Sequence, residues 1–167
     1  MKLKKIYMSA LAMGLMIPAL SMNVVASEGT GETPVSYDNR NYIPDPDNPI
    51  DPQWAVTIPS TINFTDDNKK IDATVELVSK NGGSLPTSDV MVSVKSKNEY
   101  ELINKDGEKV SYQLAYGDKV MTSSNTEVAI LNSGNTMEKG YAILGNDKAP
   151  SRGSYDDTLT YTISYTN

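Results

Sequence analysis

The sequence predicts an all-β fold, an immunoglobulin-like or pilin-like antiparallel β-sandwich, and three observations carry this prediction. Short runs of alternating apolar and polar residues recur from Trp54 to the end of the chain. Turn-forming residues separate these runs at the intervals typical of an antiparallel sandwich or barrel. Val, Thr, Ser and Tyr dominate the runs, and such side chains suit a pleated, half-buried surface. No run in this part has a convincing helical period.

The first 26 residues have the layout of a secretory signal peptide. A basic region at residues 2–5 precedes a mostly apolar run, residues 6–20, and short side chains then lead to Ala26. The apolar run is short and Pro18 interrupts it, which argues against a membrane-spanning anchor. The sequence therefore predicts a secreted protein, extracellular or associated with the cell wall or surface, with no membrane insertion after signal cleavage.

Residues 27–53 are expected to form an extended spacer. More than half of the chain's 9 prolines fall in this segment. Proline lacks the N–H that a helix or an inner strand needs, and it favours polyproline geometry. Tyr37, Tyr42 and Ile43 are the residues of the spacer that we expect to contact a partner or the following domain.

Four oxygen-bearing residues crowd one short stretch of the spacer, namely Asp45, Asp47, Asn48 and Asp51. Carboxylate and amide oxygens are ligands that Ca²⁺ accepts, so calcium binding at residues 45–51 is one interpretation. The spacing does not match an EF-hand loop, and prolines stiffen the segment. The sequence favours the alternative, a solvated linker, and we assign no metal ligand.

The β-sandwich domain is expected over residues 54–167. Its first strand contains Trp54, which shares a face with the other apolar residues of its run, and Pro59 ends that strand. Asp66–Asn68 and Asn81–Gly83 are expected turns. The expected strands are Trp54–Ile58, a short run at Ile62 and Phe64, Ile71–Val78, Val90–Val94, Tyr100–Ile103, Val110–Tyr116, Thr126–Leu131, Tyr141–Leu144 and Leu159–Tyr165.

The middle of the domain contains a hairpin signal. Asp106-Gly107 lies between two alternating runs, and this dipeptide is typical of tight β-hairpin turns. In the preceding strand, the three valines of residues 90–94 are expected to face the core. In the strand that follows the hairpin, Val128 and Ile130 are the apolar residues of note.

The last strand alternates from Leu159 to Tyr165 without a break. Its Leu, Ile and two Tyr residues are expected to face the core, and its Thr and Ser residues to face water. Exposed edge strands usually carry charge, proline or a bulge, and this strand has none of them. We therefore expect it to lie inside a sheet, hydrogen-bonded on both sides, or to be completed by another chain.

Composition removes several functional classes. The chain has 0 Cys and 0 His, which excludes thiol nucleophiles, imidazole bases and the usual zinc ligands. Loss of residues 1–26 would leave 12 basic and 21 acidic residues, a net charge of −9 that disfavours nucleic acid. Asp156 and Asp157 are adjacent in an extended segment and point to opposite faces, unlike a glycosidase pair. We predict no catalytic residues, no cofactor and no enzyme activity.

Residues 153–165 resemble the closing motif of bacterial fimbrial and spore-coat-U-type domains, with Gly153, Tyr155, an Asp-Thr pair and a final alternating strand. The stretch from Val92 to Leu114, with its Asp-Gly turn, resembles the middle of such domains. The resemblance covers about residues 75–165. It implies a pilin-like sandwich. The layout of signal, acidic proline-rich spacer and cysteine-free β domain is similar to secreted surface proteins of Gram-positive bacteria.

The predicted function is that of a secreted, non-enzymatic cell-surface protein, pilin-like or adhesin-like, acting in adhesion or surface-structure assembly. The expected partners are a protein or a glycan at the surface, and self-association through strands is one mode. The alternative is a carbohydrate-binding module in which Trp54 and Tyr side chains stack on sugars. The apolar neighbours of Trp54 on its strand favour a core tryptophan instead.

Overall fold

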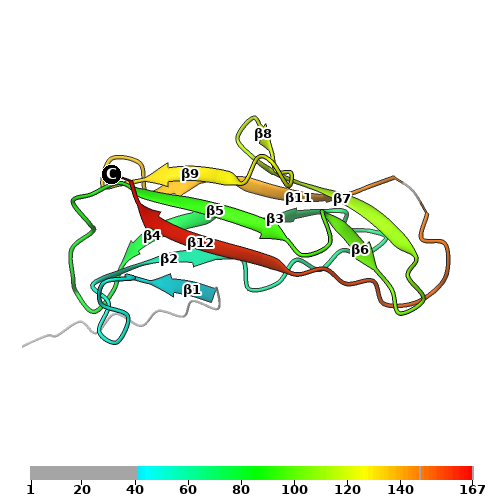
Figure 1. Cartoon of the computed structure of the whole chain (residues 1–167), viewed down its shortest axis with the longest axis horizontal. Coiled ribbons are helices and arrows are strands. Elements are labelled where there is room, and N and C mark those ends of the chain that lie inside the picture. Colours follow the sequence, from blue (N-terminus) through cyan, green and yellow to red (C-terminus); the bar gives the residue numbers. More distant parts are fainter. Residues whose placement is uncertain (1–40, 147, 167) are drawn as a thin grey trace, which may run out of the picture. The chain divides into compact units, whose positions relative to one another are not determined.

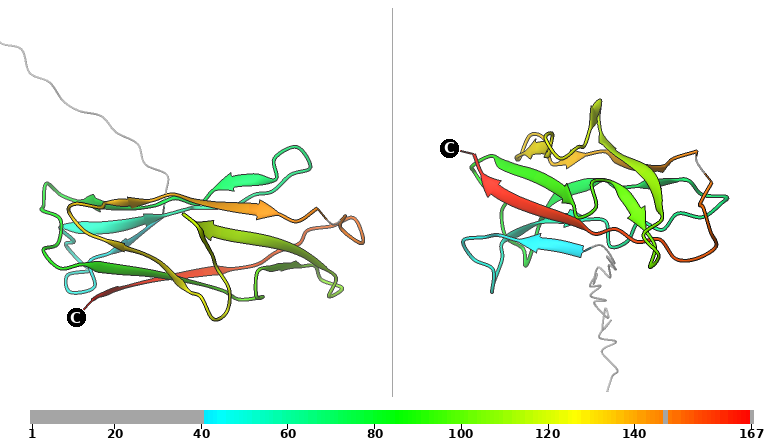
Figure 2. Two further views of the ribbon diagram at one scale, coloured as in Figure 1. Left: turned by 90° about the horizontal axis from the view of Figure 1, so that it is seen from above. Right: turned by 45° about the vertical axis from the view of Figure 1, so that its right-hand side comes forward.

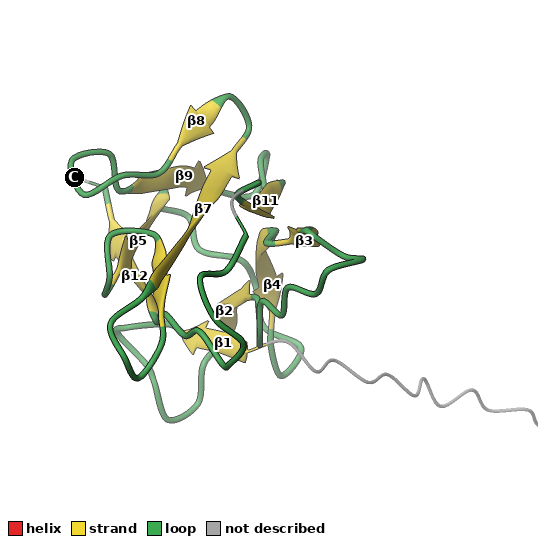
Figure 3. Cartoon of the chain, turned by 90° about the vertical axis from the view of Figure 1, so that its right-hand side faces the viewer, coloured by secondary structure: helices red, strands yellow, loops and turns green. Residues whose placement is uncertain are grey.

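The structure is a computed structural model that describes residues 41–146 and 148–166. The expected signal peptide and the first part of the spacer, residues 27–40, lie outside these residues. Every described element belongs to one compact unit of the chain. All regular elements described are strands, so the all-β prediction is confirmed (Figure 3). Within the described ranges, no helix has the length and apolar character needed to cross a membrane.

Every named strand pair is antiparallel, as predicted. The strands, labelled in Figure 1, are β1 (Asn41–Pro44), β2 (Trp54–Ile58), β3 (Lys70–Asp72), β4 (Val75–Ser79), β5 (Val90–Ser96), β6 (Glu101–Ile103), β7 (Lys109–Tyr116), β8 (Lys119–Val120), β9 (Glu127–Leu131), β10 (Met137–Glu138), β11 (Gly140–Leu144) and β12 (Leu159–Tyr165).

The strands form two layers. One set has the order β1-β2-β4-β10, and a second has β3-β11-β7-β6 with β8 on β7. These two sets form one continuous layer. The chain passes from β3 of the second set directly into β4 of the first, and from β10 of the first directly into β11 of the second. A hydrogen bond of 2.8 Å from Ala73 N to Gly140 O bridges the break. The third set, β12-β5-β9, lies across the core from the first layer (Figure 2).

The core lies between the layers and follows the predicted alternation. The three valines of β5 are almost fully buried. Alternate positions of the expected 71–78 strand are buried too, although the structure splits that strand into β3 and β4. Trp54 is only 3% exposed, and its ring meets the Tyr165 ring edge-on with centroids 5.9 Å apart. Trp54 is therefore a core residue, as its neighbours on β2 indicated.

Both predicted glycine turns are present. Asn81 and Gly82 take positive φ values of 52° and 72°, which glycine and asparagine tolerate best. Gly107 has φ of 81° in the β6–β7 hairpin, and the carbonyl oxygen of the Asn104 side chain accepts bonds from the backbone N–H groups of Asp106 and Glu108. The local turn chemistry thus fixes the hairpin that Asp-Gly predicted.

The two apolar residues singled out in β9 lie on opposite sides of their sheet. Val128 is buried, whereas Ile130 is 41% exposed. The β5–β9 register shifts between Val92 and Ser93, so that Val92 pairs with Ala129 and Ser93 pairs with Glu127. Val128 is therefore an extra residue in a β-bulge, which reverses the alternation beyond it.

The expectation that the last strand lies inside a sheet is wrong for the described strands. β12 pairs with β5 along its whole length, from Leu159 opposite Ser96 to Tyr165 opposite Val90. No other described strand pairs with it, so β12 ends its sheet. The predicted facing is confirmed, because Leu159, Tyr161, Ile163 and Tyr165 all pack on or in the core. The alternative stated above, completion by another chain, fits this edge position.

The expected spacer contributes a strand from Asn41 onward. β1 pairs with β2, from Asn41 opposite Ile58 to Pro44 opposite Ala55. Pro44 is tolerated there because β1 is at the edge of its sheet and needs no donor on its outer side. Ile43 packs against the core, as expected of a contact residue.

Candidate functional site

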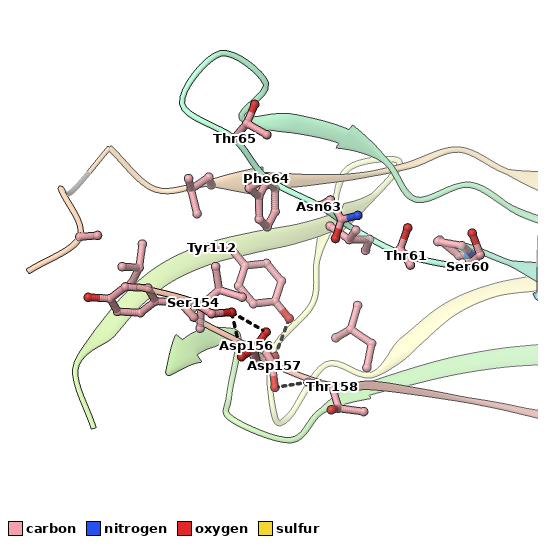
Figure 4. A pocket seen from close by; sticks show the side chains of 18 of the residues that line it. Ser60, Thr61, Asn63, Phe64, Thr65, Tyr112, Ser154, Asp156, Asp157 and Thr158 are labelled. Atoms are coloured by element: carbon pink, nitrogen blue, oxygen red, sulfur yellow. Dashed lines mark hydrogen bonds between the residues drawn. The ribbon is translucent and has the colours of Figure 1, made fainter. Parts of the chain in front are cut away.

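A hollow lies beside the start of β12, where Leu159 and Tyr161 line it, and we call it the β12 groove. It has a volume of about 750 Å³. One wall is the segment that leads into β12 together with the start of that strand, residues 153–161. The other is the end of β2 and the connection that follows it, residues 58–66. Figure 4 shows both walls and the side chains between them. Apolar side chains line much of the space between the walls, namely Leu102, Val110, Tyr112 and Leu144.

Among the described residues, the backbone of β12 has no partner strand on the side away from β5. Lys97 N donates to Thr158 O at 2.9 Å, and Thr166 N donates to Asp89 O at 3.0 Å. In an antiparallel pair, residues that bond to the neighbour alternate with residues that point away from it. The even-numbered residues of β12 therefore bond to β5. The odd-numbered residues direct their N–H and C=O groups to the open edge; they are Leu159, Tyr161, Ile163 and Tyr165.

The opposite wall has the pattern of a strand without a partner. Ile62 and Phe64 are partly buried against the core, while Thr61, Asn63 and Thr65 are exposed. This is the alternation expected from the sequence, yet the structure assigns no strand there. After β2 ends at Ile58, Thr65 is the first residue of this wall with a backbone hydrogen bond to a described residue, which it exchanges with Asn68 in the predicted turn. The groove therefore separates two extended segments, and neither has a described backbone partner on the groove side.

Aromatic rings form part of the groove and connect it to the core. Phe64 and Tyr112 both line it, and their ring centroids are 5.9 Å apart. Tyr112 also meets the buried Tyr100 ring at 5.9 Å, in an edge-on arrangement. The floor of the groove is thus apolar and continuous with the interior, which suits the insertion of apolar side chains.

Asp157 fixes the start of β12 to the rest of the sandwich. Its carboxylate accepts hydrogen bonds from Tyr112 Oη at 2.6 Å, Ser96 Oγ at 2.7 Å and Asn98 N at 3.0 Å. Burial and the nearby Asp157 charge raise the pKa of the Tyr112 phenol, so this hydroxyl stays a donor. The neighbouring Asp156 is exposed and accepts from Ser154 Oγ, so the two carboxylates have separate hydrogen-bond partners (Figure 4).

Tyr161 brings a second polar contact from β12 into the core. Its hydroxyl and that of Tyr116 are 2.7 Å apart. Burial, as the largest cause, raises the pKa of Tyr161 to about 12, and burial also raises the pKa of Tyr116. Ionising either phenol would place a charge in an apolar interior, so the pair is stable only while both are neutral.

We expect alkaline pH to unfold the protein through these buried tyrosines. Because the folded-state pKa of Tyr161 is raised, its contribution to stability is complete below pH 10 and is lost as pH rises from about 10 towards 12. Far-ultraviolet circular dichroism and tyrosinate absorbance, recorded together against pH, check this. Loss of β structure should accompany ionisation of the buried phenols. Full ionisation of all 10 tyrosines with unchanged β structure would contradict it.

The far end of β12 is tied to the β1–β2 loop. Tyr165 Oη donates to Asp45 Oδ1 at 3.2 Å, and the same oxygen accepts from Asp47 N at 3.0 Å. Asp51 Oδ1 accepts from Asn81 Nδ2 at 3.1 Å. The oxygen-rich stretch considered for calcium therefore makes protein contacts, and no group of three metal-ligating side chains is found in the described ranges.

The exposed aromatic rings do not form an open stacking platform. Trp54 is buried, and the Lys80 ammonium lies 4.5 Å from the centroid of the exposed Tyr42 ring. Lys70 covers Tyr141 in the same way, at 4.0 Å. A lysine therefore occupies one face of each of these two rings, where a sugar would otherwise stack.

The sequence predicted β12 and which of its side chains face the core. It did not predict the groove or the role of Asp157. The alternation of Ile62 and Phe64 was the one local signal for the opposite wall. Nothing local shows that this segment lacks a strand partner, because pairing depends on segments far away in the sequence.

Comparison with known proteins finds no family model that matches the chain and no matching curated protein. Among solved structures, the chain is similar to the P pilus rod subunit PapA, with a TM-score of 0.39 and 13% identity over 59% of this chain and 80% of that one. It is also similar to a chain of a chaperone–tip adhesin complex of CFA/I fimbriae biogenesis, with a TM-score of 0.38 and 10% identity. That match covers 81% of this chain and 40% of the other. Both TM-scores are low, so the all-β architecture stands on the strand pairing described above.

Proposed function

We propose that this protein is an exported, non-enzymatic subunit of a surface structure, and that it assembles by accepting an extended strand of a second copy in the β12 groove. One observation carries the proposal: β12 pairs with only one described strand, and its first residues face residues 60–65, which form no described strand, across an apolar groove. A strand added beside β12 would bond to its free N–H and C=O groups and place alternate side chains on the apolar floor.

The edge composition supports strand addition. Leu159–Tyr165 carries no charge, no proline and no bulge, so nothing prevents another strand from pairing with it. Natural monomers usually protect such an edge, because an unprotected one associates. A second copy is the simplest source of the strand, since every copy presents the same groove at the same concentration.

The proposal predicts that charge on the β12 edge blocks association. Thr160 and Thr162 are exposed on β12, and replacing both with Lys puts two ammonium groups beside the open edge. We expect self-association of the full chain, followed by sedimentation velocity across a concentration series, to weaken at least about tenfold. The protein should stay folded, because neither side chain faces the core.

A matched control places the same two charges on a strand that has partners. Ser111 and Gln113 are exposed on β7, which lies between β11 and β6, so Ser111→Lys with Gln113→Lys should leave association unchanged. Equal weakening by the control would attribute the effect to net charge. The proposal is wrong if the wild-type chain sediments as a monomer at the highest concentration measured.

A further inference from the structure

The β1–β2 loop, residues 45–53, presents an unusual apolar tip. Ile50 is 96% exposed, more than any other large apolar residue described. Two exposed carboxylates, Asp47 and Asp51, flank it. Full burial of an isoleucine side chain contributes up to about 3 kcal/mol, so this residue could supply much of the free energy of a docking contact.

Hydrogen bonds and prolines hold this loop in shape. Asn48 Nδ2 donates to Asp51 O at 2.6 Å, and Asn81 Nδ2 donates to Asp51 Oδ1 at 3.1 Å. Asp47 N donates to Asp45 Oδ1, which the Tyr165 hydroxyl also reaches. Three prolines in the same loop fix φ at their positions. A partner would therefore meet a preorganised surface, with little chain entropy left to lose on docking.

A second hollow, which we call the basic hollow, has complementary chemistry. Lys69, Lys148 and Arg152 line it, and Asp66 is the single acid among its described lining residues. In the part of the chain that the structure describes, none of the three cations forms an ion pair or a side-chain hydrogen bond. The apolar lining residues are Val110, Leu144, Ala149, Pro150 and Tyr155. The chain as a whole is acidic, with a formal net charge of −6, so this local cluster of cations offers a surface that attracts carboxylates.

The wall of the basic hollow is also held firmly. The Glu108 carboxylate accepts hydrogen bonds from Asn104 Nδ2 at 2.7 Å, from Tyr155 Oη at 3.2 Å and from Ser151 Oγ. These bonds lower the pKa of Glu108, so its carboxylate stays ionised and remains the acceptor of all three hydrogen bonds. They connect the loop before β12 to the β6–β7 hairpin, so the hollow does not depend on a free loop.

The tip and the basic hollow lie at opposite ends of β12. Tyr165, the last residue of β12, contacts the tip loop through Asp45. Gly153 and Tyr155 of the basic hollow precede Leu159, the first residue of β12. Figures 1 and 2 show the two loops at the two ends of the described sandwich. One copy therefore cannot place its own Ile50 in its own basic hollow.

We propose that the β1–β2 loop of one copy docks in the basic hollow of a second copy, so that copies join head to tail. Asp47 and Asp51 would face the three cations, while Ile50 would bury against the apolar lining. The two surfaces differ, so the contact is heterologous, and each new copy leaves one tip and one hollow free. This contact does not use the β12 edge, so it does not depend on the proposed strand addition. The basic hollow adjoins the β12 groove, because Val110, Leu144 and Tyr155 line both.

Complementation between two defective variants tests the proposal. Ile50→Asp disables the tip, and Lys148→Glu with Arg152→Glu disables the hollow, all at exposed positions that leave the core intact. Each variant alone should self-associate at least about tenfold more weakly than wild type. On the Thr160→Lys, Thr162→Lys background, which blocks strand addition, an equimolar mixture should form dimers and nothing longer, because only one intact tip and one intact hollow can meet. A mixture no more associated than either variant alone, or variants that associate like wild type, would overturn it.

Disulfide trapping gives an independent readout, since the chain has 0 Cys. Under mild oxidation, the pair Ile50→Cys and Ala149→Cys should yield a ladder of covalent oligomers on a non-reducing gel. The control pair, Ile50→Cys and Ser133→Cys, uses an exposed loop away from the hollow and should yield no ladder beyond dimers of like cysteines. Placing the first pair on the Thr160→Lys, Thr162→Lys background separates the two proposals, because the ladder should persist there. Equal ladders from both cysteine pairs would refute the tip-to-hollow contact.

Discussion

Replacing Asp157 with Ala is expected to destabilise the protein by about 3 kcal/mol or more. The substitution removes the acceptor for Tyr112 Oη, Ser96 Oγ and Asn98 N at once. Removing one partner of a buried hydrogen bond costs more than the bond contributed, because the other partner is left without one. Urea unfolding followed by tryptophan fluorescence measures the loss, since the buried Trp54 is the chain's single Trp.

The adjacent residue provides the matched control for this prediction. Asp156 is exposed, and its carboxylate accepts only from Ser154 Oγ among the described residues. Asp156→Ala should therefore change the free energy of unfolding by less than about 0.5 kcal/mol. Asp157→Asn should fall between the two, since it keeps one acceptor oxygen. Similar values for Asp156→Ala and Asp157→Ala would show that the network at Asp157 does not stabilise the fold.

Replacing Gly140 with Ala is expected to cost about 2–3 kcal/mol through overpacking. An added Cβ at Gly140 would overlap the ring of Tyr116, which lies directly against this glycine. The ring is almost fully buried, so it can move only by disturbing the core and its hydroxyl contact with Tyr161. Because Tyr161 belongs to β12, we expect the substitution to loosen that strand as well as lower overall stability.

Two measurements make this prediction specific. Gly153→Ala is the control, because a Cβ there has no neighbour within 4 Å and the substitution should be nearly neutral. In the double variant Gly140→Ala, Tyr116→Leu, the clash is removed, so its cost should be smaller than the sum of the two single substitutions. Additive costs would show that the ring of Tyr116 is not what excludes a side chain at Gly140.

The strands and their faces were predictable because their signals are local. Alternation with a period of two identified β2, β5 and β12, and it placed their apolar residues on the core side. Asp-Gly gave the β6–β7 hairpin, since the turn itself requires a residue that accepts positive φ. The burial of Trp54 followed from its neighbours on the same strand in the same way.

The features that make a candidate site were not local, and only the tertiary structure decided them. Sheet order leaves β12 with one partner, β5, although the strand alone has the composition of an inner strand. The Asp157 network joins residues 45 to 61 positions apart, and the Val128 bulge depends on the register with β5. Hydrogen bonds between strands form only after distant segments meet, so the sequence by itself determined which residues face inward. The packed fold determined which edge remains open, because an edge is defined by the neighbour that a strand lacks.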